Sequence, residues 1–319
     1  MNTRFKTSKK FSRKEDLSFI DFIEDRISSL KECNRIGTAM NYNRAKSSLQ
    51  NYLQGKDVKF DEITNYFIDN YNDWLMKRGM LRNSASFHMR ILRAVYNKGV
   101  KKGFAIQSYP FKGVYTGIDA TPKRYLEIRT LKRMIALDLS ENEDLELARD
   151  MFFFSIYSRG MSFVDMVYLR RQNIEGGMLM YARKKTGKIL RVRIEKEMKI
   201  IIDRYQKRFP SSSFVFPILS EEGNPQTYYR QYTSALTIFN GRLKKLADMA
   251  GLSVKPSSYT ARHTWASLAR RMDIPISVIS ESMGHRSENT TLIYLASLEN
   301  SLVDKANRRI LQHLGSLLS

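Results

Sequence analysis

Apolar residues in the first 108 positions recur with helical spacing in four stretches. The first follows Ser12-Arg-Lys-Glu15, whose spacing is typical of a capping box, and carries apolar residues every three or four positions as far as Leu30. Further helices are expected at residues 38–54, from about residue 60 to Gly79, and from residue 84 onward. Gly99 and Gly103 mark where the last of these is expected to weaken and stop. Four amphipathic helices with short turns predict a helical bundle over residues 15–108.

Residues 109–123 show little periodicity and contain prolines and glycines, which indicates a linker. Residues 1–14 form a short basic tail. The remaining residues, 124–319, are long enough for a second domain with its own core.

The second domain mixes helical and strand patterns. Two strands, at residues 178–183 and 189–194, flank a Lys-Thr-Gly-Lys turn, and residues 214–216 could add a short third strand. Helices are expected elsewhere, one of them apolar on all sides and therefore central. The expected helices are residues 126–137, 144–157, 196–208, 226–250, 258–272, 275–283, 289–298 and 300–315. The predicted fold class is therefore mainly α, with a helical bundle followed by a mostly helical domain that holds a small antiparallel sheet.

Composition narrows the setting of the protein. Cys33 is the only cysteine among 319 residues, which excludes an intrachain disulfide and a cysteine-cluster metal site and fits a reducing cytoplasm. The amino-terminal residues lack the apolar stretch of a signal peptide, and no run of apolar residues is long enough to span a membrane.

The charge of the chain points to its partner. The formal net charge is +22. Residues 1–120 hold 22 basic and 12 acidic residues, and residues 121–319 hold 32 and 20, so both parts are strongly basic. A surplus spread over a folded chain favours a polyanionic partner, although it does not distinguish DNA from RNA.

Five basic or nucleophilic residues follow one another in the second domain in an informative order. They are Arg159, within Arg-Gly-Met-Ser-Phe-Val-Asp; Lys185, at the hairpin turn; Arg262, within Tyr259-Thr-Ala-Arg-His; His285, after Gly284; and Tyr294, nine residues after that histidine. Gly284 can end a helix with positive φ, which places His285 in the following turn, and Asn289 or Thr290 can cap the next helix. Taken singly, Tyr294 could be a core aromatic and Arg262 a solvated surface residue. Together they form a set able to attack a phosphodiester with a phenol.

This order and spacing resemble the tyrosine recombinase (phage integrase) family. The resemblance implies that residues 15–108 are a SAM-like core-binding domain and that residues 124–319 are a catalytic domain. It also implies that Tyr294 attacks the scissile phosphate, giving a 3′-phosphotyrosyl link and a free 5′ hydroxyl. Arg262 and His285 would bind the non-bridging oxygens, and Lys185, with Lys184 as the next choice, would protonate the leaving oxygen. No metal and no cofactor is implied.

Two positions depart from the common motifs of the family. Tyr259 stands where the second motif usually has histidine, and its hydroxyl could still donate to a phosphate oxygen. Ser162 stands where the first motif usually has arginine, with Asp165 in the place of the acid. Arg159 is three residues earlier, almost one turn if the segment is helical, and is the predicted substitute. A variant branch of the family shares this Arg-Gly-Met-Ser-Phe-x-Asp pattern.

The expected partner is double-stranded DNA with specific sites, bound by a monomer in free solution and by a tetramer on paired sites. An accessory DNA-bending protein is a further possible partner, and the short amino terminus favours a simple recombinase. A helix at residues 300–315 is expected to dock on a neighbouring protomer or in cis. The alternatives are a type IB topoisomerase, a catalytically silent DNA-binding protein, and an RNA-binding protein. The basic residues of the bundle expected to contact DNA are Arg44, Lys46, Arg82, Arg90, Arg93 and Lys98.

Overall fold

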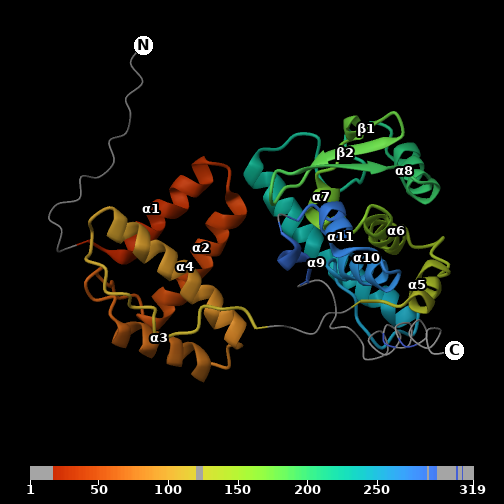
Figure 1. The fold of residues 1–319 in the computed structure, drawn as a ribbon. Coiled ribbons are helices and arrows are strands. Elements are labelled where there is room, and N and C mark those ends of the chain that lie inside the picture. Colours follow the sequence, from red (N-terminus) through yellow and green to blue (C-terminus); the bar gives the residue numbers. More distant parts are fainter. Residues whose placement is uncertain (1–16, 120–124, 286, 293–306, 308–310, 312–319) are drawn as a thin grey trace, which may run out of the picture. The chain divides into compact units, whose positions relative to one another are not determined.

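The computed structural model describes residues 17–119, 125–285, 287–292, 307 and 311, and divides the chain into two compact units, residues 1–120 and 121–319. The first unit contains four helices around one apolar core: α1 (Phe19–Glu32), α2 (Ile36–Tyr52), α3 (Asn65–Lys77) and α4 (Arg82–Lys101) (Figure 1). The four-helix bundle predicted from the hydrophobic pattern is confirmed.

The ends of these helices correct one expectation, that on Gly99, and leave the predicted capping box untested. The hydroxyl of Ser18 caps α1 by accepting a hydrogen bond from the Asp21 amide at 3.0 Å, whereas the capping box at residues 12–15 lies outside the described residues. Gly99 does not weaken α4, which continues to Lys101. A Cβ on Gly99 would lie only 2.1 Å from the ring of Phe60, so this glycine allows a core ring to approach the helix. Gly103, at φ +74°, is the residue that ends it.

Part of the segment predicted to be a linker packs on the first unit. Phe111 and Val114 are buried in the core of the bundle, and Ser86 on α4 donates a hydrogen bond to the carbonyl of Gly117 at 2.6 Å. Phe111 and Val114 thus anchor this stretch to the bundle, although its sequence shows no periodicity.

The second unit surrounds a central helix, α6 (Glu143–Tyr157), whose apolar residues are buried on all sides as its sequence predicts. The other helices of the unit are α5 (Ile128–Ile135), α7 (Phe163–Val167), α8 (Lys196–Arg208), α9 (Pro225–Met249), α10 (Thr260–Arg271), α11 (Ile276–Ser282) and α12 (Glu288–Leu292). Figure 1 shows the small sheet on one side of this helical group.

The sheet has three antiparallel strands in sequence order: β1 (Ile174–Glu175), β2 (Met178–Ala182) and β3 (Ile189–Arg193). The hairpin of β2 and β3 was predicted correctly. The possible strand at residues 214–216 is not formed, because these residues supply only an isolated bridge between Phe214 and Arg170. Phe214 and Phe216 are fully buried side chains of the core, so their apolar character reflects packing.

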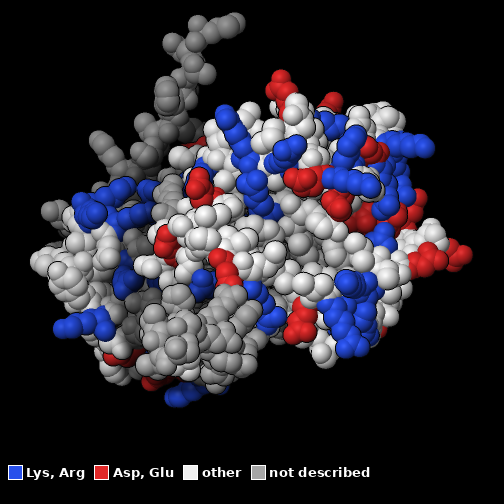
Figure 2. Space-filling view, turned by 45° about the vertical axis from the view of Figure 1, so that its right-hand side comes forward, with Lys and Arg blue, Asp and Glu red and all other residues white. Residues whose placement is uncertain are grey.

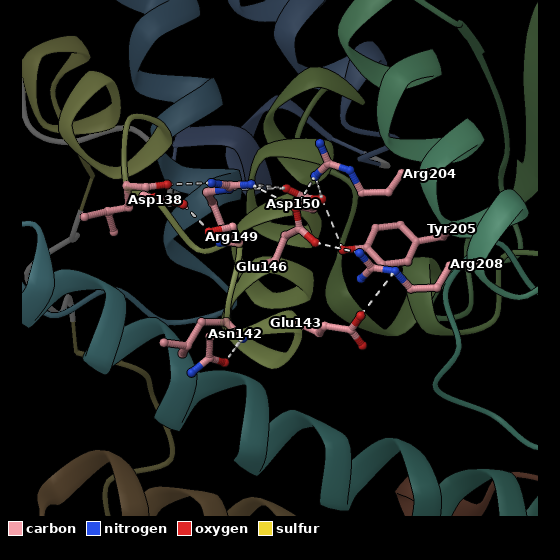
Figure 3. A network of polar contacts seen from close by, with 12 residues as sticks. Asp138, Asn142, Glu143, Glu146, Arg149, Asp150, Arg204, Tyr205 and Arg208 are labelled. Atoms are coloured by element: carbon pink, nitrogen blue, oxygen red, sulfur yellow. Dashed lines mark hydrogen bonds and ion pairs between the residues drawn. The ribbon is translucent and has the colours of Figure 1, made fainter.

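A polar network joins α6 to α8 (Figure 3). The carboxylate of Asp150 is buried and accepts hydrogen bonds from Arg204 and from the Tyr205 hydroxyl, the latter at 3.1 Å. Glu146, one turn earlier on α6, pairs with Arg204 at 3.0 Å and with Arg208 at 3.0 Å. Burial, followed by the charge of Asp150, raises the pKa of Tyr205 above its usual range, so its hydroxyl remains a donor.

We expect Asp150→Ala to destabilise the second unit by about 1–3 kcal/mol, because the buried Tyr205 hydroxyl would lose its acceptor and Arg204 one of its two ion-pair partners. Thermal unfolding followed by circular dichroism measures this. The matched control is Asp203→Ala, which removes only an exposed pair with Lys199 and should cost less than about 1 kcal/mol. Equal shifts in melting temperature for the two variants would contradict a structural role for the network.

Candidate active site

Arg262 lies at the centre of the candidate site, in the first turn of α10, and is 2% exposed. Its Nη1 donates a hydrogen bond to the carbonyl of Gly160 at 2.5 Å, and its Nη2 donates to the carbonyl of Met283 at 2.7 Å. The same Nη2 is 2.9 Å from Nε2 of His285. One guanidinium therefore joins the end of α6, the end of α11 and the histidine.

Two glycines make this arrangement possible. Gly160 has φ +74°, and a Cβ there would lie 3.1 Å from Cγ of Arg262, so only glycine lets α10 come this close without a shift. Gly284 has φ +65° and ends α11, as its place in the sequence predicts. His285 therefore lies in the turn between α11 and α12, also as predicted.

His285 is held as a neutral imidazole. Burial, followed by the charges of Arg262, Arg183, Lys185 and Lys188, lowers the pKa of His285 to about 4. Because arginine only donates, Nε2 is the acceptor in the contact with Arg262, which leaves the ring hydrogen on Nδ1. Nδ1 can then donate to Oγ1 of Thr291, 2.8 Å away and fully buried. A phosphate anion bound near this ring would favour the protonated form.

The hairpin between β2 and β3 brings lysines to this site. Lys185 is exposed at the turn, and its charge acts on His285. The side chain of Lys184 instead lies 3.9 Å over the ring of Tyr168, and its backbone amide donates to Asp165. Of the two lysines weighed from the sequence, Lys185 has the better position to reach a substrate at His285.

Arg159 does not lie where its sequence spacing suggested. α6 ends at Tyr157, and Arg159 and Gly160 both have positive φ, +62° and +74°, so Arg159 and Ser162 do not share a helical turn. The premise of that spacing argument is wrong, because the helical backbone ends before Arg159. Nη1 of Arg159 lies 3.4 Å from the carbonyl of Arg191 on β3.

The other departures from the family motifs are also placed. Tyr259 immediately precedes α10, one turn before Arg262, is 46% exposed, and has its ring centroid 5.8 Å from that of His263. Ser162 caps α7, and its hydroxyl donates to Oδ2 of Asp165 at 2.6 Å. The helix α12 begins at Glu288, so Asn289 and Thr290 lie inside its first turn and do not cap it.

Tyr294 lies outside the described residues, two positions beyond the end of α12. The helix predicted at residues 300–315 is also outside them, apart from residues 307 and 311. Among the residues that the structure describes, no group of three or more His, Cys, Asp or Glu side chains could hold a metal ion. None of the described helices is both long and apolar enough to cross a membrane.

Sequence reasoning missed two residues of the site, Thr291 and Arg183. Arg183 follows β2, is 6% exposed, and donates from Nη1 to the carbonyl of Gly284 at 2.9 Å. A signal was present, because Leu179, Tyr181 and Arg183 occupy alternate positions and the first two are apolar and face inward. Burial raises the pKa of Tyr181, and the charges of Arg262, Arg183 and Arg159 all act on its hydroxyl in the opposite direction.

The predicted DNA-binding residues of the first unit differ in their surroundings. Arg82 and Arg93 on α4 both contact the segment at residues 115–119: Arg82 lies 3.8 Å over the ring of Tyr115, and Arg93 donates to Thr116 at 2.8 Å. Lys46 on α2 forms an ion pair with Glu24. Of the remaining three, Arg44 is exposed, whereas Arg90 and Lys98 are partly buried. Figure 2 shows lysine and arginine side chains in several separate groups on the visible face.

Comparison with known proteins identifies the family. The profile of the phage integrase SAM-like domain matches residues 18–114, and that of the phage integrase family matches residues 126–301. An integrase of Staphylococcus phage L54a is 26% identical over 117 residues, which cover 37% of this chain and 29% of that protein. The match thus spans less than a third of that relative's length.

Solved structures show the same fold. A lambda integrase dimer bound to a COC′ core site has a TM-score of 0.65 and 14% identity, covering 87% of this chain and 95% of that one. The Tn1549 transposon integrase in complex with transposon right end DNA has a TM-score of 0.64 and 13% identity, covering 92% and 99%. Since the family profile matches more than half of the chain, and a second profile covers the helical bundle, the chain belongs to the phage integrase family, the tyrosine recombinases, with a SAM-like amino-terminal domain.

Proposed function

We propose that this protein is a site-specific DNA recombinase that cleaves and rejoins strands through Tyr294. The observation that carries the proposal is the buried contact between Arg262 and His285, at the turn that leads into the segment of Tyr294. A phosphodiester resists nucleophilic attack because it is an anion, and a catalyst must neutralise its non-bridging oxygens. A planar guanidinium suits this task because it donates in two directions at once.

In the proposed reaction, the Tyr294 hydroxyl loses its proton to water as its oxygen attacks the scissile phosphorus, and the bond from phosphorus to the 5′ oxygen breaks. Lys185 supplies the proton that the leaving 5′ oxygen needs, while Arg262 and His285 bind the non-bridging oxygens. The hydroxyl of Tyr259, one turn before Arg262, would be a further donor. The 3′-phosphotyrosyl bond conserves the energy of the phosphodiester, so a 5′ hydroxyl of a second duplex can reverse the step.

The proposed partner is duplex DNA with defined sites, bound as a monomer and paired in a tetramer. A lambda integrase tetramer bound to a Holliday junction, with a TM-score of 0.64 and 15% identity, covers 89% of this chain and 79% of that one, which supports this assembly. An accessory DNA-bending protein, a cytoplasmic location and a place in a mobile element go with the proposal. So does membership of the branch with Arg-Gly-Met-Ser-Phe-x-Asp in its first motif.

The test is covalent trapping. A duplex selected from a random-sequence library by its affinity for the protein is nicked next to each candidate phosphate, so that cleavage releases a short strand and cannot be reversed. We expect an adduct that survives denaturation and whose modified peptide contains Tyr294. An adduct on Tyr259 or Tyr229, or DNA binding without any adduct, would contradict the proposal; the second result would favour a catalytically silent DNA-binding protein.

Strand exchange separates a recombinase from a type IB topoisomerase, which shares the chemistry. Two labelled duplexes carrying the selected sequence should yield recombinant strands in each other's presence. Relaxation of a supercoiled plasmid that lacks this sequence, without any strand exchange, would support the topoisomerase alternative.

Binding to the duplex should depend steeply on salt. If roughly 6–10 phosphates are neutralised, the affinity falls by about 10³–10⁵-fold between 50 and 200 mM salt. Arg44→Gln should lower the slope of the logarithmic plot by about one, because Arg44 is exposed. Lys46→Gln is the control on the same helix, and it should change the slope less because Glu24 already neutralises this lysine. A larger change for Lys46→Gln would mean that DNA displaces Glu24.

A further inference from the structure

The candidate site contains a second buried guanidinium, that of Arg183, which is not part of the common motifs of the family. Arg183 joins the end of β2 to the hairpin turn, since its amide donates to the carbonyl of Lys188 at 2.9 Å and its own carbonyl accepts from the Gly187 amide at 2.8 Å. Its side chain turns inward, where Nη1 binds the carbonyl of Gly284 and Nε lies 3.8 Å from Oδ2 of Asp165.

We propose that Arg183 is the second phosphate-binding guanidinium of the site, in the role of the arginine that Ser162 replaces. This assignment rests on the proposed function. It differs from the assignment of Arg159, which rested on sequence proximity.

The surroundings of Asp165 support this assignment. In the common motif an arginine stands three residues before the acid, and here that position is Ser162. Its hydroxyl occupies one side of Oδ2, while Oδ1 accepts the backbone amide of Lys184 at 2.8 Å. The ion pair of Asp165 is formed with Arg183. The acid of the motif is therefore retained, and its guanidinium partner comes from the end of β2.

Arg183 and Arg262 hold the same turn in parallel ways. Arg262 donates to the carbonyl of Met283, and Arg183 donates to the next carbonyl, that of Gly284. A Cβ on Gly284 would lie 2.8 Å from Cδ of Arg183, so the glycine also makes room for this side chain. Both guanidinium groups thus flank His285, and each acts electrostatically on its ring.

The buried charges of this region suit an anion. The charged residues buried in the described part of the second unit include Arg183, Arg262, Asp165 and Asp150. Asp150 belongs to the network between α6 and α8, whereas Asp165 pairs with Arg183. Two buried guanidinium groups that hold one turn would bind a phosphate oxygen of DNA through charge-assisted hydrogen bonds.

Arg159 has a different environment. Its contact with the carbonyl of Arg191, a residue of β3, is long, at 3.4 Å, and is exposed. The two arginines can therefore be separated by mutation, because Arg159 contacts the carbonyl of Arg191 whereas Arg183 contacts the carbonyl of Gly284.

The experiment compares Arg183→Ala with the matched control Arg159→Ala in single-turnover cleavage of the selected duplex. We expect Arg183→Ala to cleave about 10²–10³-fold more slowly than the wild type, the usual effect of losing one preorganised donor. Arg159→Ala should stay within about threefold of the wild type, because its loss leaves both guanidinium groups at His285 in place. The same comparison is then made with a methylphosphonate at the scissile position, whose neutral methyl group replaces one charged oxygen.

The methylphosphonate carries no negative charge, so a guanidinium that neutralises the phosphate contributes less to its cleavage. The defect of Arg183→Ala should therefore shrink to within about tenfold of the wild type on the methylphosphonate. Adding Ser162→Arg to Arg183→Ala should also restore part of the rate on the ordinary phosphodiester, since it returns a guanidinium to the side of Asp165. A large, rescuable defect in Arg159→Ala with a near-normal Arg183→Ala would overturn the assignment, as would a defect in Arg183→Ala that the methylphosphonate does not relieve.

Arg183→Lys is a second variant for the case that Arg183→Ala does not fold. It keeps a positive charge beside Asp165 but cannot reach the Gly284 carbonyl and a phosphate with one fork, so its cleavage should fall by about tenfold or more. Wild-type cleavage by a folded Arg183→Lys would count against the assignment.

Binding of tungstate, a phosphate-shaped dianion, tests Arg183 independently of the nucleophile. In calorimetry, Tyr294→Phe protein should bind tungstate, and adding Arg183→Ala should weaken this binding at least about tenfold, as expected for loss of a charge-assisted hydrogen bond. Adding Arg159→Ala instead should leave it unchanged. If the wild type forms no adduct with DNA while tungstate binding follows this pattern, the proposed function fails and Arg183 still belongs to an anion site. Tungstate binding that is unaffected by Arg183→Ala would overturn the role of Arg183.

Discussion

Tyr294→Phe is expected to form no covalent adduct with DNA, while its affinity for the same duplex stays close to that of the wild type. The change removes one oxygen atom, and that oxygen would form the bond to phosphorus. Neither Tyr259, before α10, nor Tyr181, on β2, is expected to take over as the nucleophile.

The measurement is denaturing electrophoresis of the variant with the nicked duplex, together with a binding titration on the intact duplex. Tyr229→Phe on α9 is the control, and it should form adducts as the wild type does. Adduct formation by Tyr294→Phe at more than a trace would show that another residue attacks the phosphate. Loss of both binding and adduct would instead indicate that Tyr294 supports the fold.

Arg262→Ala is expected to slow cleavage by about 10²–10³-fold or more, the second largest effect on activity. The variant would lose the guanidinium for the phosphate and, in addition, the hydrogen bonds that fix Gly160, Met283 and His285 relative to one another. His285 would lose its contact with Arg262 at Nε2, whereas the contact of Nδ1 with Thr291 would remain. The affinity for DNA should change little, because Arg262 would be one of several phosphate contacts.

Single-turnover cleavage with saturating protein separates this effect from binding. Arg270→Ala removes the same charge near the other end of α10 and should cleave at a rate close to that of the wild type. Arg262→Lys should lie between the two, because an ammonium keeps the charge but not the two-pronged geometry. Cleavage by Arg262→Ala within about threefold of the wild type would remove Arg262 from the catalytic set.

The sequence by itself determined the fold class and most of the site. Helical periodicity marked the four helices of the bundle, and alternation marked the hairpin of β2 and β3, because each pattern reports which side of a local element is buried. The ends of helices were also readable where backbone geometry demands a particular residue. Gly284 is an example, because its positive φ favours glycine and places His285 in the turn that follows α11. The order of Lys185, Arg262, His285 and Tyr294 gave the family.

Only the tertiary structure decided which side chains meet. Arg183 reaches a carbonyl 101 residues away, and no local period encodes a contact of that separation. The positive φ angles of Arg159 and Gly160 exclude the helical turn on which the relocation to Arg159 relied. Gly99 and Phe214 were misjudged for the same physical reason: a glycine that admits Phe60, and an aromatic ring that fills a core, have the local appearance of a helix end and of a strand. Their meaning depends on the packing partner, which the fold alone supplies.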